Sequence, residues 1–76
     1  MERIETKIKK LKVNDTVVIY YVSGGRMEPF EDTIKSKGTK YIHTNKGYKF
    51  GLNGYGEYGW YLFPGNMCEY KEWEEI

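Results

Sequence analysis

The residue types best suited to catalysis are scarce in this chain. His43 and Cys68 are the only histidine and cysteine among the 76 residues. A nucleophilic cysteine needs a base within hydrogen-bond reach and a third group that orients the base, and no motif around either residue supplies them. A zinc site needs about four ligands. We therefore expect no catalysis, no metal and no cofactor, and we interpret Cys68 as a small packing residue.

Lysines and aromatic residues are interleaved between residues 35 and 50, a composition that suits nucleic-acid binding. Lysine neutralises phosphate, and aromatic rings stack on bases. The net charge of +1 and the pI near 7.8 argue against it, since they lie below the basic footprint of typical binders. Direct nucleic-acid binding is therefore the alternative hypothesis. Its candidate residues are Lys35, Lys37, Lys40, Tyr41, Lys46, Tyr48 and Lys49.

Glycines and aromatic residues are concentrated between residues 47 and 65, which hold six glycines and seven aromatic residues. Tyrosine and tryptophan provide a large contact area at low entropic cost and are enriched at binding hot spots. The segment from residue 69 onward is acidic and can face a basic partner. A glycine-rich connector beside a solvated helix face is the structural alternative. The candidate protein-binding residues are Tyr55, Tyr58, Glu69, Glu72, Glu74 and Glu75.

Short strands must position these residues. Residues 16–22 (TVVIYYV) are β-branched or aromatic throughout and apolar on both faces, which predicts a central strand covered on both sides. Turn residues separate this segment from four further predicted strands. Five short strands joined by tight turns favour a closed or nearly closed small barrel. The four further strands are predicted at residues 30–35, 39–44, 48–52 and 60–63.

Both ends of the chain carry helical signals. Asn66 followed by Glu69 forms a capping-box pattern, and we predict a C-terminal helix over residues 66–75. Residues 1–10 are either a flexible leader or a helical one, because the spacing of Ile4 and Ile8 fits a helix while the following residues also fit a strand. The face that docks the C-terminal helix on the barrel is predicted to hold Met67, Tyr70 and Trp73.

The small size of the domain limits its core. A chain of this length buries only about 60% of its unfolded surface, and aromatic residues, 17% of the chain, or homodimerisation must supply the remaining stability. A homodimer is therefore the alternative to a stable monomer. The predicted core consists of Val17, Ile19, Tyr21, Ile34, Ile42, Phe50, Trp60 and Leu62.

Three short segments resemble small β-barrel proteins. Residues 11–17 (LKVNDTV) resemble the opening of SH3-like, Tudor-like and KOW-like barrels, with Asn14 in place of the usual glycine. Residues 40–42 end a similar hairpin. Residues 62–64 (LFP) precede a capped helix, as in small barrel proteins of bacteriophages that infect Gram-positive bacteria. The resemblance covers roughly residues 11–75 and implies a mainly β fold, a five-stranded SH3-like barrel with a short C-terminal α-helix, in one domain over residues 1–76.

The resemblance also implies a function. Some phage proteins of this size are host-takeover factors that bind and inhibit a host protein, for example the sliding clamp of DNA replication. We therefore expect a non-catalytic inhibitor of a host protein from the replication or other nucleic-acid machinery, with a nucleic-acid-binding SH3/KOW-like module as the alternative. The basic N-terminus lacks the apolar run of a signal peptide, and no segment is apolar enough to span a membrane. A lone thiol fits a reducing compartment, so we expect the bacterial cytoplasm.

Overall fold

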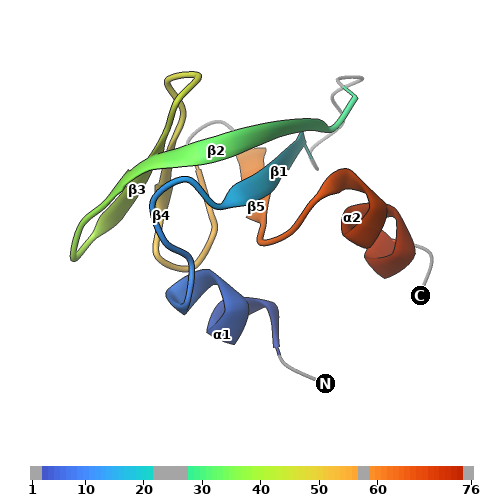
Figure 1. The fold of residues 1–76 in the computed structure, drawn as a ribbon, viewed down its shortest axis with the longest axis horizontal. Helices are drawn as coiled ribbons and strands as arrows, with labels where there is room; N and C mark the ends of the chain where they lie inside the picture. The colour runs from blue at the N-terminus through green and yellow to red at the C-terminus, as the bar shows by residue number, and fades with distance from the viewer. Residues whose placement is uncertain (1–2, 22–27, 57–58, 75–76) are drawn as a thin grey trace.

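The five strands form one antiparallel, nearly closed barrel (Figure 1). The computed structural model describes residues 3–21, 28–56 and 59–74. The strand order is β4-β3-β2-β1-β5, which is the order of an SH3-like barrel, and two further bridges, Phe50 to Gly56 and Tyr55 to Tyr61, narrow the gap between β4 and β5. The predicted fold class is confirmed. The elements are α1 (Ile4–Lys9), β1 (Thr16–Tyr21), β2 (Phe30–Lys37), β3 (Tyr41–Thr44), β4 (Lys49–Gly51), β5 (Trp60–Phe63) and α2 (Met67–Glu74).

The barrel interior holds alternate residues of each strand. Six of the eight predicted core residues are buried there: Val17, Ile19, Ile34, Ile42, Phe50 and Leu62. The other two, Tyr21 and Trp60, are half-buried and meet edge to face at 5.3 Å between ring centroids. Each stands at one end of its strand. Trp60 packs against the core cluster from there, and Tyr21 is half-buried outside that cluster.

The N-terminal segment is helical and contributes to the same core. Ile8 on α1 is 1% exposed, and Leu11, just after the helix, also joins the interior cluster. The side chain of Ile8 packs against Gly54, where an added Cβ would lie only 2.7 Å from Ile8 Cδ1. The sequence of this segment fits both a helix and a strand. The structure has a helix, which packs Ile8 into the barrel core. A helix of six residues is too short to be stable alone.

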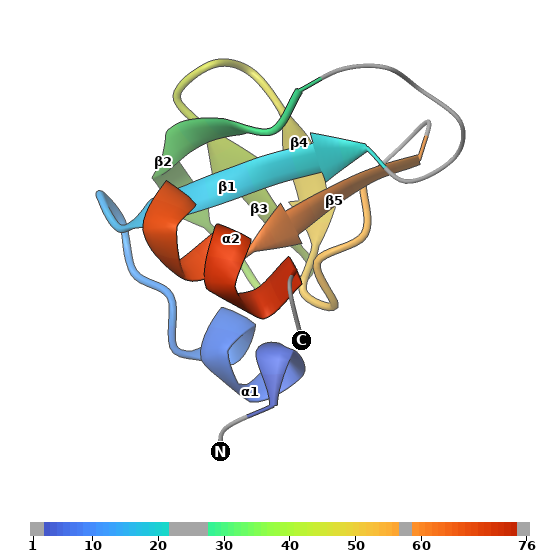
Figure 2. The ribbon, with the colours of Figure 1, turned by 90° about the vertical axis from the view of Figure 1, so that its right-hand side faces the viewer.

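Helix α2 covers the outer face of β1 and β5 (Figure 2). Val18, Phe63 and Tyr70 are buried between them, so β1 is covered on both sides, as its sequence predicts. The predicted capping box is confirmed. The Asn66 side chain accepts the Glu69 N–H at 2.9 Å, and the Glu69 carboxylate accepts the Asn66 N–H at 3.3 Å.

Asn14 and Asp32 stabilise turns between these elements. Asn14 adopts φ 75°, the left-handed conformation that asparagine tolerates in place of glycine. The buried carboxylate of Asp32 accepts the main-chain N–H groups of Thr33 and Lys46, at 2.7 and 3.3 Å. Asp32 thereby connects the β3–β4 turn to β2. The two hydrogen bonds offset the cost of burying its carboxylate.

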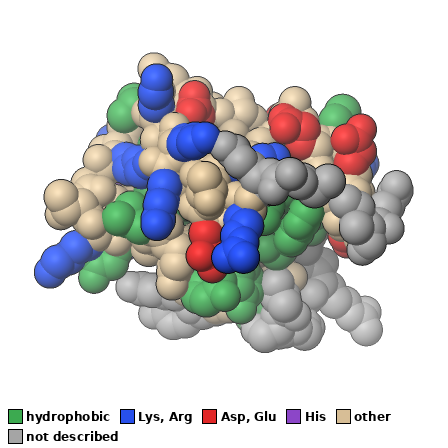
Figure 3. Space-filling view, turned by 90° about the horizontal axis from the view of Figure 1, so that it is seen from below, with side chains coloured by type: hydrophobic (Ala, Val, Ile, Leu, Met, Phe, Trp, Pro, Cys, Tyr) green, Lys and Arg blue, Asp and Glu red, His purple; other side chains and the backbone are tan. Residues whose placement is uncertain are grey.

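Basic side chains are concentrated on one part of the surface. Figure 3 shows lysine and arginine side chains mostly over the left and centre of the face seen from below, whereas acidic side chains lie both among them and toward the right, on the side where Figure 1 places α2. Within the described ranges, no helix is both long and apolar enough to cross a bilayer.

Candidate protein-binding surface

A chain of aromatic rings crosses the outer side of the barrel beside α2. We call it the aromatic face, and it consists of Tyr55, Tyr61, Tyr20, Tyr70 and Trp73. Successive ring centroids lie 5.0 Å (Tyr55 to Tyr61), 5.5 Å (Tyr61 to Tyr20) and 5.2 Å (Tyr20 to Tyr70) apart. Trp73 contacts Tyr20 at 5.8 Å and Tyr70 at 5.9 Å. These separations are typical of favourable aromatic pairs.

The sheet register places these rings side by side. Tyr20 and Tyr61 are direct partners in the β1–β5 pairing, so they project from the same face of the sheet. Tyr55 reaches Tyr61 through an isolated bridge, and its N–H donates to the side chain of Asn53 at 3.1 Å. Helix α2 brings Tyr70 and Trp73 against the other side of Tyr20. Four of the five rings therefore stand on β1, β5 or α2, and Tyr55 stands on the connection between β4 and β5.

Both ends of the aromatic face are accessible. Tyr55 is 60% exposed and Trp73 is 37% exposed, whereas Tyr70 between the helix and sheet is buried. Burial, followed by the neighbouring Tyr70, Tyr61 and Tyr55, raises the pKa of Tyr20 to about 12. The phenol of Tyr20 is therefore neutral at physiological pH. A partner meets a neutral ring surface that can both pack and hydrogen-bond.

The predicted protein-binding residues are only partly brought together. Tyr55 lies on the aromatic face, and Glu72 and Glu74 are exposed on α2, which borders it. The Glu69 carboxylate is engaged in the capping box, so Glu69 serves the helix start. Tyr58 and Glu75 fall outside the described residues. Sequence reasoning did not include Tyr61 and Tyr70 in a binding surface. The period-two alternation of the strands does place Tyr20 opposite the core-facing residues.

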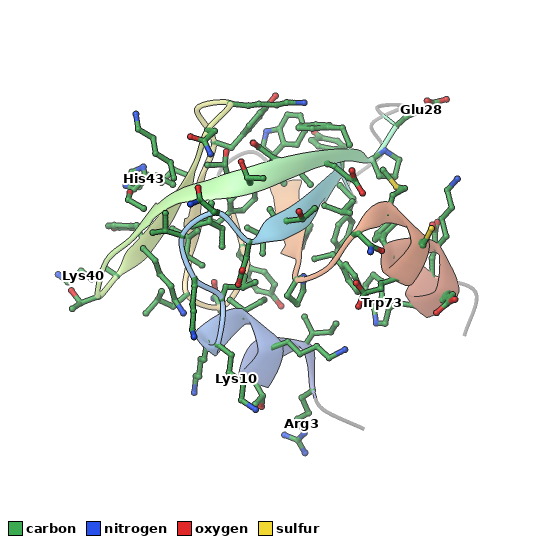
Figure 4. The ribbon with its side chains drawn as sticks, viewed as in Figure 1. Arg3, Lys10, Glu28, Lys40, His43 and Trp73 are labelled. Carbon is green, nitrogen blue, oxygen red and sulfur yellow. The ribbon has the colours of Figure 1, made fainter. Side chains whose placement is uncertain are left out.

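The predicted nucleic-acid residues are only partly brought together, because Lys37, Lys40 and Tyr41 line one hollow of about 440 Å³ that does not include the others. Lys40 belongs to the β2–β3 turn and Lys46 to the β3–β4 turn, at opposite ends of β3 (Figure 4 labels Lys40). Tyr48 is half-buried and packs on Phe30 and Trp60, at 5.4 and 5.2 Å. Its ring is therefore committed to the barrel, and the prediction that it stacks on a base is corrected.

Lys37 has a structural role. Its ammonium donates to the main-chain carbonyls of Ile8, at 3.2 Å, of Lys9, and of Leu11, at 3.0 Å. Ile8 and Lys9 end α1, and Leu11 lies two residues after it. Acceptors at a helix C-terminus and the negative end of the helix dipole favour a cation there. Its assignment to a phosphate-binding surface is corrected for that reason.

What remains of the basic candidate surface is small. Lys49 lies over the ring of Tyr41, 4.1 Å from its centroid, and Tyr41 is 46% exposed. Lys46 lies 5.2 Å from the Phe30 ring centroid. Lys35 is exposed on β2. The Tyr41–Lys49 pair adjoins the hollow that Lys37, Lys40 and Tyr41 line, whereas Lys46 lies at the opposite end of β3, so the described candidates form two groups.

The two residues first considered for catalysis lie far apart. His43 projects from β3 at one side of the molecule, and α2, which carries the exposed Cys68, lies at the other (Figure 4). Among residues 3–21, 28–56 and 59–74, no group of three or more His, Cys, Asp or Glu side chains is placed to hold a metal ion.

Comparison with protein-family models, with curated proteins and with solved structures gave no match to this chain.

Proposed function

We propose that this protein is a non-catalytic binding protein whose aromatic face engages the surface of another protein. The carrying observation is the continuous chain of rings from Tyr55 to Trp73, exposed at both ends. Rigid aromatic side chains lose little entropy on binding and dominate the energetics of many interfaces. Their support by paired strands and a docked helix means that little reorganisation is needed on contact.

The charge of α2 favours a basic partner surface. Glu72 and Glu74 are exposed on α2 beside the aromatic face, together with Lys71, whereas two of the exposed candidate lysines, Lys35 and Lys49, belong to β2 and β4. Acidic groups at the rim of an interface steer a basic partner and disfavour nucleic acid, whose phosphates they repel. DNA-handling proteins carry such basic surfaces. With the resemblance to phage barrel proteins, this supports an inhibitor of a bacterial replication protein, and the sliding clamp is the example that the resemblance offers.

The partner can be identified by affinity capture. Immobilised protein is incubated with a lysate of a Gram-positive bacterium, with and without nuclease treatment, and the retained proteins are identified by mass spectrometry. The proposal predicts one stoichiometric protein that survives nuclease and resists moderate salt. Retention of many nucleic-acid proteins that disappear on nuclease treatment would overturn it and favour the Tyr41–Lys49 region as a nucleic-acid contact, because phosphate contacts are strongly salt-dependent.

A further inference from the structure

A hollow of about 560 Å³ lies next to the aromatic face, between α2 and the residues that lead into β2. Tyr20 and Tyr70 of the aromatic face line it, so the two features are continuous. Figure 4 shows Glu28 beside the start of β2, above α2, with Trp73 below the helix. The volume falls within the range of about 300–1,000 Å³ that is usual for ligand sites, and it can take a long side chain with part of its main chain.

Part of the lining is apolar or aromatic. Tyr20, Pro29, Met67 and Tyr70 contribute to the walls. Methionine adapts its shape to an incoming group. The aliphatic stem of a long cationic side chain buries well on such walls, and the faces of the tyrosine rings attract the cation itself.

The charged groups of the lining come from two elements. Glu28 precedes β2, and Glu74 lies at the end of α2; both are exposed and both line the hollow. Lys71 also lines it, which leaves a formal charge of −1 among these three residues. Burial, then the charge of Glu74 and its side-chain hydrogen bond, raises the pKa of Tyr70, which is consistent with a carboxylate held against the aromatic wall.

We propose that this hollow binds an arginine side chain of the partner protein, and we call it the arginine groove. Carboxylates at the edge of a hollow walled by tyrosine rings suit the planar guanidinium, which carries five donors and also stacks on rings, better than they suit the compact ammonium of lysine. The inference rests on the proposed function and adds the chemistry of its ligand: an exposed arginine on a protein surface that also covers the aromatic face.

The test is an NMR titration of the full chain with short peptides. The probes are N-acetyl-Gly-Arg-Gly-amide, its citrulline analogue, which keeps the shape but lacks the charge, and its lysine analogue. We expect the arginine peptide to shift the amide signals of Tyr20, Met67 and Glu74 and to bind at least about tenfold more tightly than citrulline, the tenfold being the loss of one charged contact. The lysine peptide should bind more weakly than the arginine peptide. Equal binding of citrulline, or equal or tighter binding of lysine, would overturn the assignment.

Glutamate variants inside and outside the lining test whether binding depends on the groove or only on the negative charge of the protein. The double variant Glu28→Gln/Glu74→Gln should lose the arginine peptide, whereas Glu72→Gln, on the same helix but outside the lining, should keep it. Lys71→Ala should tighten binding, because it removes a competing cation. An equal loss in Glu72→Gln would contradict the proposal. Retention of the peptide by the double variant would also contradict it.

The two proposals can fail separately. If Tyr55→Ala abolishes capture of the partner while Glu28→Gln/Glu74→Gln leaves both capture and peptide binding intact, the arginine groove is wrong and the protein-binding function stands. If the wild-type chain captures no protein, the proposed function is wrong, and the peptide titration still decides whether the groove recognises arginine.

Discussion

The side-chain ammonium of Lys37, at the end of β2, donates a 3.0 Å hydrogen bond to the main-chain carbonyl of Leu11, the residue that links α1 to the barrel. The same ammonium reaches the carbonyls of Ile8 and Lys9. One cation therefore satisfies three acceptors at the end of a helix too short to be stable alone. Lys37 thereby holds the end of α1 against the barrel by hydrogen bonds, and Ile8 of α1 packs in the barrel core.

Loss of the Lys37 hydrogen bonds should destabilise the protein. Lys37→Met keeps the aliphatic stem but removes the ammonium from the Lys9 and Leu11 carbonyls, while the Ile8 carbonyl keeps the Leu11 N–H at 3.2 Å. We expect a loss of about 1.5–3 kcal/mol in the free energy of unfolding, measured by urea denaturation. Lys35→Met, an exposed lysine on the same strand, is the control and should change stability by less than about 0.5 kcal/mol. Equal effects of the two substitutions would contradict the role given to Lys37.

The capping box makes a second prediction. Asn66→Ala should cost about 1 kcal/mol of stability, because the Glu69 N–H loses its acceptor. Asn66→Asp should retain most of it, since aspartate also caps well. Glu72→Ala, on the exposed face of the same helix, controls for helix propensity. Thermal unfolding followed by circular dichroism gives the comparison, and an Asn66→Ala protein as stable as the wild type would show that the cap does not hold α2.

Two glycines with positive φ should respond differently to alanine. A Cβ on Gly47, at φ 96°, would have no neighbour within 4 Å, whereas a Cβ on Gly54, at φ 86°, would lie 2.7 Å from Ile8 Cδ1 and 3.3 Å from the Leu62 carbonyl oxygen. Gly47→Ala should cost about 1–2 kcal/mol, the strain of the left-handed conformation. Gly54→Ala should cost clearly more, because the buried Ile8 must also move. Denaturant unfolding of both variants checks this order, and equal losses would contradict the packing of α1 on residue 54.

The phenol of Tyr20 predicts a pH dependence at high pH. Its pKa is about 12 in the folded protein, against an ordinary value of 10.0, so the unfolded chain loses this proton first. The stability contributed by Tyr20 is fully present below pH 10 and declines as the pH rises toward 12. Tyr20→Phe should flatten this part of the stability profile, measured by urea unfolding at each pH. An unchanged slope would show that Tyr20 is not shielded as described.

Local patterns predicted much of the fold. The continuous β-branched and aromatic run of residues 16–22 located β1 and its two covered faces, and the Asn66–Glu69 spacing located α2 to within a residue. These features depend on neighbours within four positions. The strand after the β2–β3 turn was predicted to begin at residue 39 but begins at Tyr41, since the longer β2 extends to Lys37.

The candidate site was harder to predict because its parts are distant in sequence. The acceptors of Lys37 are 26 to 29 residues away, so its charge looked available for phosphate. Tyr48 looked like a base-stacking ring until its packing on Trp60 was known. The arginine groove joins residues near position 20, positions 28–29 and α2. Only the β1–β5 pairing and the docking of α2 bring these segments together.

The central claim is that the aromatic face, rather than the lysine-bearing strands, binds the partner. Tyr55 and Tyr41 form a matched pair, because both are exposed tyrosines, at 60% and 46%, and only Tyr55 belongs to the aromatic face. The most direct measurement compares the affinity of the captured partner for the wild type, Tyr55→Ala and Tyr41→Ala by calorimetry. We predict that Tyr55→Ala weakens binding at least about tenfold, as removal of a hot-spot ring does, and that Tyr41→Ala binds like the wild type. Loss of binding in Tyr41→Ala with full binding in Tyr55→Ala would contradict the account.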